Sequence, residues 1–300
     1  MDMYPVKRLL AWLLPDRLYV RMAFFKSHRW LPRTPPVTFN EYLCDLKGSG
    51  ALARFQPFAD KYAVRDHVAR KIGAQYLVPL LGTAERLTRA VWDNLPDAFV
   101  LKTNHGSSWN RIVRNKGAED YSAVAVLANG WLKKNFYYVR REHQYKNIKP
   151  ILMFEELLTE ENRDNITDYK FFCFHGKIRF ILVSDSGGQR NNDYYDRSWN
   201  RLDITRTARP DDAVPRPERL DEMVQVSERL AEDFTFVRVD LYDVGERIYF
   251  GELTFVPGGG SGRFRSIDFE ECAGRLWAGE DVDLTRFRDK RALPAKAAAA

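Results

Sequence analysis

The amino-acid sequence predicts an α+β fold that combines antiparallel hairpins with amphipathic helices. The clearest hairpin is residues 236–255, where apolar and polar residues alternate on both sides of Gly245. A second hairpin is expected over residues 168–183, around Gly176. Apolar residues at helical spacing predict helices over 60–73, 120–136 and 220–233. Period-two alternation is typical of half-buried strands and a 3.6-residue period of helices, so both kinds of element are expected.

The first hairpin carries the most chemical information. Gly245 supplies the positive φ that its turn requires. We expect a three-residue loop over 244–246, which places Arg238 opposite Glu252 on one face of the sheet. It also places Asp240 on that face, opposite Phe250. A two-residue loop would move Glu252 to the other face, because a slip of one residue reverses every side chain.

The predicted pairing gives this hairpin one apolar and one polar face. The apolar face contains Val237, Val239, Leu241, Leu253 and Phe255, and the polar face contains Arg238, Asp240, Glu252 and Thr254. Two carboxylates on one face repel each other unless a cation compensates, and Mg²⁺ takes one or two carboxylates together with phosphate oxygens. Asp240 and Glu252 are therefore candidate magnesium ligands. The alternative is an exposed hairpin with ordinary surface charges.

Composition allows a large core and favours anionic partners. The chain has 300 residues, of which 45% are hydrophobic, enough for one large domain or two lobes. Its net charge of +6 suits nucleotides, acidic polysaccharide, nucleic acid or the inner membrane surface. The sequence shows neither a membrane-spanning segment nor a signal peptide. Three scattered cysteines without a C-x-x-C motif indicate a reducing, cytoplasmic location and argue against a zinc site.

The first 33 residues are basic, aromatic and amphipathic. Such a segment can lie on the inner face of the plasma membrane as a peripheral contact. The favoured prediction is instead a pair of helices that packs onto the main body. A proline-rich connector over 31–37 follows, and then a short helix over 39–47 for which Asn40 is the expected N-cap.

Two further segments suit phosphate and substrate binding. A buried strand ends at Lys102 and is followed by a small polar loop, residues 103–108, whose N–H groups can face a phosphate. This is not a Walker A loop. His105 in this loop is either a pocket residue or a turn residue. Residues 258–262 form a glycine-rich loop that can approach an anionic substrate.

Other segments leave their roles open. The basic and aromatic segment 137–149 fits single-stranded nucleic acid, a substrate cleft or a solvated surface. Residues 184–219 are expected to form a long irregular loop in which Asp193–Asp196 and Trp199 line the acceptor side. The helix over 60–73 is expected to be capped by Asp60 and to expose Lys61 and Arg65.

Six segments, taken in order, resemble the TupA-like ATP-grasp family, named after a teichuronopeptide biosynthesis protein. They are DK at 60–61, FVLKTNHG at 99–106, FEELL at 154–158, DYKFFCFHGK at 168–177, FVRVDLY at 236–242 and FGELTF at 250–255. The resemblance covers about Phe39 to Leu276. The superfamily pattern is R-x-D followed by E-x-N, and Thr254 stands where Asn is usual. Whether Thr254 ligates the metal therefore stays open.

The resemblance implies an ATP-grasp fold, in which two α+β lobes grip ATP between antiparallel sheets. It implies an N-terminal helical extension (1–56), a first lobe (57–154), a second lobe with the magnesium site (155–285) and a disordered tail (286–300). It also implies an ATP-dependent ligase that joins a carboxylate to an amine through an acyl phosphate. The expected setting is bacterial surface polysaccharide, capsule or cell-envelope biosynthesis, with an amino acid joined to a uronic acid and with a homodimeric enzyme.

The resemblance also assigns roles to residues, with ATP and Mg²⁺ as cofactors and no nucleic-acid partner. The implied ATP contacts are Lys102, His105, Gly106, Ser107, Glu155, Glu156, Leu158, Asp168 and Lys170. The implied metal ligands are Asp240, Glu252 and Thr254, and the implied catalytic residues are Arg238 and Lys170. The implied substrate contacts are Arg65, Gly259, Gly260, Ser261 and Arg263.

Three alternative functions are weighed against this one. A sugar or small-molecule kinase would stop at phosphorylation. A glycosyltransferase would carry a D-x-D metal motif after a strand, which the sequence lacks. A non-enzymatic basic nucleic-acid-binding module would leave Lys102, Asp240 and Glu252 unexplained, and its affinity would depend steeply on salt.

Overall fold

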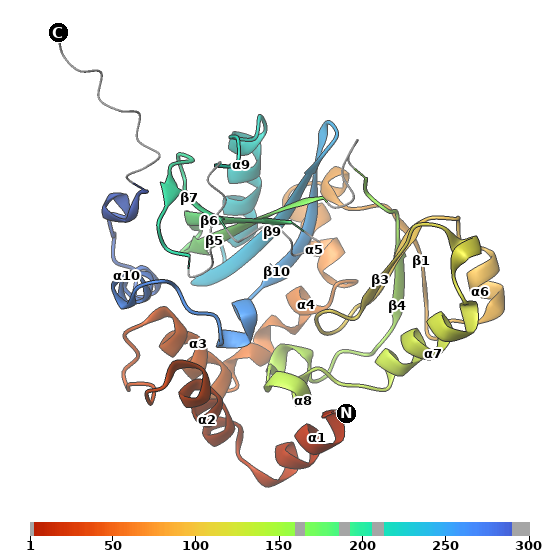
Figure 1. Ribbon diagram of the computed structural model, residues 1–300, viewed down its shortest axis with the longest axis horizontal. Helices are drawn as coiled ribbons and strands as arrows, with labels where there is room; N and C mark the ends of the chain where they lie inside the picture. Colours follow the sequence, from red (N-terminus) through yellow and green to blue (C-terminus); the bar gives the residue numbers. More distant parts are fainter. Residues whose placement is uncertain (1–2, 160–165, 186–192, 206–212, 290–300) are drawn as a thin grey trace. The chain divides into compact units, whose positions relative to one another are not determined.

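The computed structural model describes residues 3–159, 166–185, 193–205 and 213–289 and divides into two compact units (Figure 1). Unit 1 comprises Met1–Ala23 and Asp45–Thr159, and unit 2 comprises Phe24–Cys44 and Glu160–Ala300. The helices are α1 (Tyr4–Leu13), α2 (Asp16–His28), α3 (Phe39–Gly48), α4 (Gln56–Ala59), α5 (Val64–Lys71), α6 (Arg89–Asp93), α7 (Tyr121–Leu132), α8 (Tyr137–Arg140), α9 (Leu220–Ala231) and α10 (Ile267–Trp277). In the described part of the chain, no helix is both long and apolar enough to cross a membrane.

Unit 1 is built on a four-stranded antiparallel sheet. Its strands are β1 (Leu80–Ala84), β2 (Phe99–Thr103), β3 (Asn110–Val113) and β4 (Leu152–Glu155), in the order β1-β4-β2-β3. Phe99 and Leu101 of β2 face a core that includes Trp92 of α6 and Val124 of α7. Lys102 alternates to the other face of the sheet. The Lys102 side chain therefore lies away from this core.

The residues predicted to cap or end helices in unit 1 lie close to their expected positions. The Asp60 carboxylate accepts hydrogen bonds from the backbone N–H groups of Tyr62 and Ala63 at 2.9 and 3.2 Å, and this turn leads into α5. Gly73 ends the segment with a φ of 112°. Asp120 caps α7 by accepting from the N–H of Ser122 at 2.8 Å.

Unit 2 is built on a six-stranded antiparallel sheet in the order β10-β9-β5-β6-β7-β8. The strands are β5 (Thr167–Phe174), β6 (Lys177–Asp185), β7 (Asp193–Asp196), β8 (Arg201–Leu202), β9 (Phe236–Val244) and β10 (Arg247–Thr254). Helix α9 packs on β5, β6 and β9. The expected apolar face of the hairpin, Val237 to Phe255, is buried.

The turn between β9 and β10 differs from the expectation. Val244 pairs with Arg247, so the loop has two residues rather than three. The pairing then shifts by one residue between Phe250 and Glu252, which is a β-bulge at Gly251. The shorter turn alone would reverse the face of every side chain in β10, and the extra residue at the bulge restores the expected faces from Glu252 onward. Glu252 therefore lies on the expected face, but opposite Asp240 instead of Arg238.

A cluster of aromatic side chains in unit 2 packs on the face of the sheet that carries Arg238. Its members are Phe39, Phe172, Phe174, Phe236 and Trp277, with ring centroids 4.7 to 6.4 Å apart. Phe172 pairs with Arg238 across β5 and β9. The aromatic cluster therefore ends where the polar row described below begins.

The expected N-cap of α3 is wrong by two residues. Thr38 occupies that position, and its hydroxyl accepts from the N–H of Glu41 at 3.3 Å while the Glu41 carboxylate accepts from the N–H of Thr38 at 2.9 Å. This reciprocal pair is a capping box. Asn40 lies inside α3 instead, and its amide donates to both carboxylate oxygens of Glu270 at 2.8 and 2.9 Å.

The expected irregular loop and tail are only partly described. Residues 186–192 and 206–212 of the loop and 290–300 of the tail lie outside the described residues. Within the loop region, the structure has β7 and β8 where no strand was expected. At the start of the tail, Arg288 forms a β-bridge with Leu202, and the N–H of Asp289 donates to the carbonyl of Arg201 at 2.8 Å.

Candidate functional site

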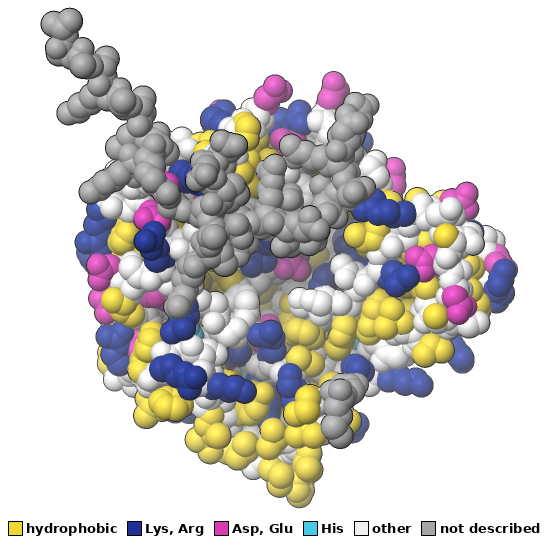
Figure 2. Space-filling model, viewed as in Figure 1, with side chains coloured by type: hydrophobic (Ala, Val, Ile, Leu, Met, Phe, Trp, Pro, Cys, Tyr) yellow, Lys and Arg dark blue, Asp and Glu magenta, His cyan; other side chains and the backbone are white. Residues whose placement is uncertain are grey.

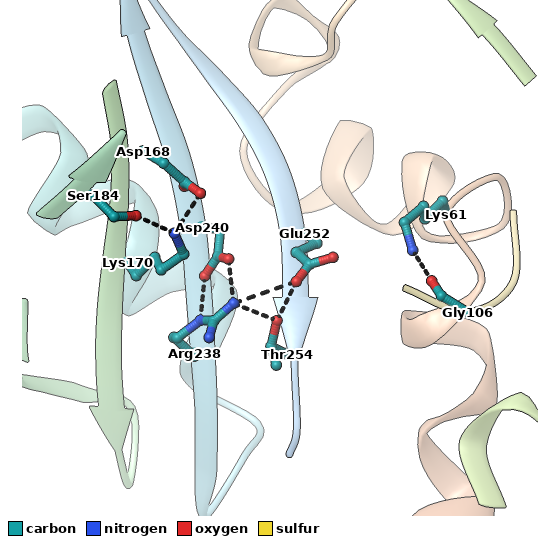
Figure 3. A network of polar contacts seen from close by, with 9 residues as sticks. All are labelled: Lys61, Gly106, Asp168, Lys170, Ser184, Arg238, Asp240, Glu252 and Thr254. Atoms are coloured by element: carbon teal, nitrogen blue, oxygen red, sulfur yellow. Dashed lines mark hydrogen bonds and ion pairs between the residues drawn. The ribbon is translucent and has the colours of Figure 1, made fainter. Parts of the chain in front are cut away.

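Three neighbouring strands of unit 2 place Lys170, Asp240 and Glu252 in one row. Lys170 of β5 pairs with Asp240 of β9, and Asp240 pairs with Glu252 of β10. Arg238 and Thr254 form the adjacent pair on the same face. Figure 3 shows these side chains converging from the three strands. We call these five residues the polar row.

Arg238 is the centre of the polar row. Its Nε and Nη2 donate to the two carboxylate oxygens of Asp240 at 2.7 and 2.5 Å. Nη2 also reaches Glu252 at 3.4 Å and the hydroxyl of Thr254 at 3.1 Å. The Thr254 hydroxyl in turn donates to Glu252 at 2.6 Å. Cross-strand carboxylates at Asp240 and Glu252 would repel each other, and Arg238 offsets that repulsion.

A second ion pair continues the polar row towards β6. The Lys170 ammonium donates to Asp168 and to the hydroxyl of Ser184, both at 2.5 Å. The other carboxylate oxygen of Asp168, Oδ1, is buried and has no hydrogen-bond partner among the described residues. A buried acceptor without a donor is unusual in proteins and is often explained by a ligand or an ion.

The bulge at Gly251 depends on close approach of backbone to backbone. A Cβ at this position would lie 3.1 Å from the Asp240 carbonyl oxygen and 3.2 Å from the Tyr242 ring. Glycine avoids both contacts, so the bulged strand can lie tightly against β9. The bulge in turn sets the face on which Glu252 lies.

The electrostatics of the polar row show a deficit of positive charge. Burial raises the pKa of Asp240 to about 7, since the lowering effect of Arg238 is partly cancelled by Asp168 and Glu252. Burial also raises the pKa of Asp168, against the lowering effect of Lys170. Burial lowers the pKa of Arg238, but the carboxylates around it outweigh this and raise the value. Three carboxylates share two cations, so a further cation would be stabilised here.

The donor set of the polar row fits magnesium together with a phosphate. Within the described ranges, no group of three or more His, Cys, Asp and Glu side chains is arranged to hold a metal by itself. Asp240 and Glu252 provide two carboxylates, with the Thr254 hydroxyl beside them. Mg²⁺ characteristically takes one or two carboxylates and completes its shell with phosphate oxygens and water. The residues present therefore match a metal that arrives with a nucleotide.

In unit 1, Lys102 and Arg65 meet at one carboxylate. The Lys102 ammonium lies 2.5 Å from Glu155 Oε2, and Arg65 Nη1 lies 3.4 Å from Glu155 Oε1. Arg65 also donates to the Val78 carbonyl at 3.0 Å. It is therefore half-buried beside the two implied ATP contacts, whereas the sequence predicted an exposed residue. Two cations around one carboxylate leave a positive excess that suits a phosphate.

The loop after β2 is held by side chains at its base. Asn104 accepts from the N–H of Ile151 and donates to Asp60, at 2.9 and 3.1 Å. The Lys61 ammonium donates to the Gly106 carbonyl at 2.6 Å (Figure 3). His105 is only 1% exposed, and its Nε2 lies 2.9 Å from the Lys134 carbonyl oxygen. Burial lowers the pKa of His105, so a neutral ring supports the loop from inside.

The remaining implied contacts lie at strand ends and in the loop. Ser107 is exposed, next to Gly106 with its φ of 85°. Glu156 follows β4 with an exposed side chain, while its N–H donates to the Pro79 carbonyl at 3.0 Å. Leu158, two residues further, is half-buried.

The glycine-rich loop follows β10. Residues 258–260 are three consecutive glycines with φ of 60°, 66° and 74°. Ser261 and Arg263 after them are exposed, and the Ser261 hydroxyl donates back to the Gly258 carbonyl at 2.7 Å. Successive left-handed glycines can turn several N–H groups towards one anion.

The residues expected to line the acceptor side are held together in a structural network, and their role towards a substrate stays a prediction. Asp193 pairs with Arg201 at 2.9 Å and accepts from the Tyr195 hydroxyl at 2.7 Å, and all three are buried. The Tyr195 ring stacks on Trp199 with centroids 4.3 Å apart. These contacts connect β7 to β8, because burial of an aspartate requires a partner for its charge.

Two contributors were missed from the sequence. Ser184 reaches Lys170 because it pairs with Asp168 across β5 and β6. A bulge between Phe172 and Cys173 shifts this register, so the turn alone does not predict the pair. Lys61 was expected only to be exposed, and its position one residue after the Asp60 turn was the available signal.

One of three comparisons with known proteins shows the family of this chain. The family model described as TupA-like ATPgrasp matches residues 46–277, which is more than half of the chain. A search of curated proteins found no match to the sequence. Among solved structures, a D-alanine–D-alanine ligase from Bacillus anthracis has 15% identity and a TM-score of 0.42, covering 74% of this chain and 65% of its own.

Two other solved structures show a similar degree of likeness. A D-alanyl-alanine synthetase A from Vibrio cholerae has 12% identity and a TM-score of 0.40, covering 66% of this chain and 55% of its own. The ATP-grasp ligase PsnB, complexed with a phosphomimetic variant of a minimal precursor, Mg and ADP, has 14% identity and a TM-score of 0.39. That match covers 74% of this chain and 56% of PsnB. This chain thus spans less than two thirds of each of these solved chains.

The breadth of the family match is what decides the class. It includes both strands of the β9–β10 hairpin, the strand that carries Lys102 and the strand that carries Lys170. The chain belongs to the TupA-like ATPgrasp family.

Proposed function

We propose that the protein is an ATP-dependent ligase that joins a carboxylate to an amine through an acyl-phosphate intermediate. The observation that carries the proposal is the polar row, in which Lys170, Asp240 and Glu252 lie side by side around Arg238. Two carboxylates, an ammonium and a guanidinium on one sheet face are the groups that phosphoryl transfer requires.

Both units carry side chains whose chemistry suits ATP. In unit 1, Lys102 binds phosphate oxygens and the loop after β2 offers its N–H groups, while Glu155, Glu156 and Leu158 bind the base. In unit 2, the orphaned Oδ1 of Asp168 accepts from a ribose hydroxyl, and Lys170 binds the transferred phosphoryl group. Asp240 and Glu252, with Thr254, would hold magnesium, which neutralises phosphate charge when bound.

The chemistry then needs little covalent work from the protein. A substrate carboxylate attacks the γ-phosphorus of ATP, ADP leaves, and an acyl phosphate forms. The amine attacks the acyl carbon, and phosphate departs. Arg238 Nη1, which makes none of the contacts within the polar row, donates to the oxyanion of the tetrahedral intermediate. Positioning and charge neutralisation account for the rate.

We propose an acidic sugar, a uronic acid, as the carboxylate and an amino acid as the amine, in surface-polysaccharide assembly. The net charge of +6 favours an acidic substrate. The glycine-rich loop, Arg65 and Arg263 are the groups proposed to bind it. Three consecutive left-handed glycines beside a cation support this assignment for the loop.

A trapping experiment tests the reaction class. The protein is incubated with ATP, Mg²⁺, a panel of uronic acids and hydroxylamine in place of the amine. A ligase forms a hydroxamate together with ADP, because hydroxylamine attacks an acyl phosphate. A kinase that phosphorylates a hydroxyl group releases ADP without hydroxamate, since a phosphate ester does not react. That second result would replace the ligase with a kinase.

A further inference from the structure

The N-terminal helices of unit 1 carry an apolar surface that faces solvent. Its residues are Val6, Leu9, Trp12 and Leu13 of α1 and Leu18 and Met22 of α2. Trp12 is 83% exposed and Leu9 is 57% exposed, and α1 has no buried residue. We call these six residues the outer apolar face. Figure 2 shows a cluster of hydrophobic side chains at the bottom of the view, over α1 and α2 of Figure 1.

The orientation of these helices is fixed by polar contacts on their inner side. Asp16, at the start of α2, accepts from the Tyr137 hydroxyl at 2.7 and 2.9 Å and pairs with Arg141 and His143 at 2.5 and 2.9 Å. On α1, the Tyr4 hydroxyl accepts from the N–H of Asn135 at 2.7 Å. The polar and aromatic side is thus attached to the unit.

This arrangement is the reverse of an ordinary surface helix. An amphipathic helix on a water-soluble domain turns its apolar stripe inward and its charges outward. Here the contacts of Tyr4 and Asp16 hold the apolar stripe outward. A contiguous apolar surface of this kind marks a binding site for a protein or a membrane.

The excess of positive charge on α1 and α2 favours binding to an anionic membrane surface. Arg8 and Arg17 are exposed and Lys7 is half-buried, and the Arg8 guanidinium lies 6.0 Å from the centroid of the Tyr138 ring. The first 23 residues contain Lys7, Arg8, Arg17 and Arg21 against Asp2 and Asp16, and Asp16 is paired with Arg141. Apolar side chains that enter the acyl region, with cations beside them at the headgroups, match an interfacial membrane helix.

We propose that α1 and the first half of α2 dock unit 1 onto an anionic lipid bilayer. The outer apolar face enters the headgroup–acyl boundary, and the exposed cations of these helices, Arg17 above all, bind lipid phosphates. A bilayer is favoured over a second protein because of the chemistry of these two helices. Helices that lie in a membrane–water interface typically carry exposed apolar side chains, often a tryptophan, together with exposed cations. This inference does not depend on the ligase reaction.

Vesicle flotation tests the proposal with the full-length protein. Phosphatidylcholine vesicles are compared with phosphatidylcholine–phosphatidylglycerol vesicles at low and high salt. We expect binding to the anionic vesicles alone, with loss at high salt. Trp12→Glu should weaken binding by roughly tenfold or more, because a large side chain no longer enters the bilayer. Arg17→Ala should weaken it by roughly fivefold, the value of one cation at an anionic surface.

Val126→Glu is the matched control, because Val126 is an apolar residue of α7 in the same unit and is 76% exposed. It should bind vesicles as the wild type does. Thermal unfolding of each variant checks the fold, and ADP release without lipid should be unchanged in Trp12→Glu. Absence of flotation with anionic vesicles, or equal flotation of Trp12→Glu and wild type, would overturn the proposal. If Trp12→Glu instead abolishes a concentration-dependent dimer in ultracentrifugation and no vesicles bind, the face belongs to a second copy.

Discussion

Glu252 lies directly opposite Asp240, with the Arg238 guanidinium bonded to both carboxylates. This arrangement is stable only while a cation offsets the two negative charges. Arg238 offsets part of the repulsion, while burial first, and then Asp168 and Glu252, raise the pKa of Asp240.

Glu252→Gln should abolish ATP turnover while leaving the fold intact. The amide keeps the shape of the side chain but removes the charge that would hold magnesium, and loss of one such electrostatic group costs roughly two orders of magnitude in rate. ADP release and the Mg²⁺-ATP thermal shift measure the effect. Glu246→Gln, the same change at an exposed position of the same hairpin, should leave both unchanged. Equal activity of the two variants would remove Glu252 from the site.

Gly251→Ala should destabilise the protein and weaken the response to magnesium. The added Cβ meets the Asp240 carbonyl oxygen at 3.1 Å, so the bulge must open and the carboxylates separate. We expect a loss of about 1 kcal/mol in urea unfolding.

The control for this change is Gly130→Ala. Gly130 lies in α7 with open space where its Cβ would be placed. Alanine there should stabilise the protein by roughly 0.5 to 1 kcal/mol, since glycine is a poor helix former. Identical Mg²⁺-ATP shifts for Gly251→Ala and wild type would show that the bulge does not set the metal site.

Thr254→Asn should retain activity, and Thr254→Val should lose magnesium affinity by roughly tenfold. Asparagine offers a carbonyl oxygen to the metal, as the superfamily pattern does, whereas valine matches the shape of threonine without an oxygen. Valine also removes the hydrogen bonds to Glu252 and Arg238. Magnesium titration of ADP release measures both variants. Full magnesium affinity in Thr254→Val would exclude a role for the hydroxyl.

Acid should destabilise unit 2 through Glu41. Burial acts to raise its pKa, but hydrogen bonds from Arg33, Thr38 and Val37 outweigh burial and lower the pKa from 4.5 to about 2. A carboxyl group whose pKa is lower in the folded state stabilises that state at pH values above its pKa in the unfolded chain. This stabilisation, about 3 kcal/mol, is therefore lost as the pH falls from 4.5 through about 2.

Glu41→Gln should remove this pH dependence from urea-unfolding curves. Glu271→Gln is the control, because Glu271 is 44% exposed and lies 3.6 Å from the same Arg33. It should keep the wild-type slope. If Glu41→Gln also keeps that slope, the carboxylate does not set the acid stability.

The sequence predicted the face of the hairpin but not its register. The alternation of Val237, Val239 and Leu241 depends only on which residues are buried. The sequence of this one strand is therefore enough to predict its buried face. The partner of Glu252 depends on the turn length and on the bulge at Gly251, which arise from packing against β9. The contribution of Ser184 could not be predicted for the same reason, because its pairing with Asp168 depends on a second bulge between Phe172 and Cys173.

Tertiary contacts decide what periodicity leaves open. The amphipathic pattern of the first 33 residues predicted helices, and α1 and α2 are present. The side of each helix that packs inward is set by Asp16 with Tyr137 and Arg141, residues more than a hundred positions apart. Likewise, Thr38 and Glu41 have the spacing of a capping box, whereas Asn40, a stronger cap in isolation, binds Glu270 from within α3.

The bulge at Gly251 and the length of the turn together determine the face on which the residues after the bulge lie. The face on which Glu252 lies depends on the sum of the loop residues and the inserted residue, and neither number matters alone. With this sequence, a two-residue turn without the bulge would place Glu252 opposite Val239, on the buried apolar face. Turn and bulge therefore set this face together, although four residues, 247–250, separate them in the chain.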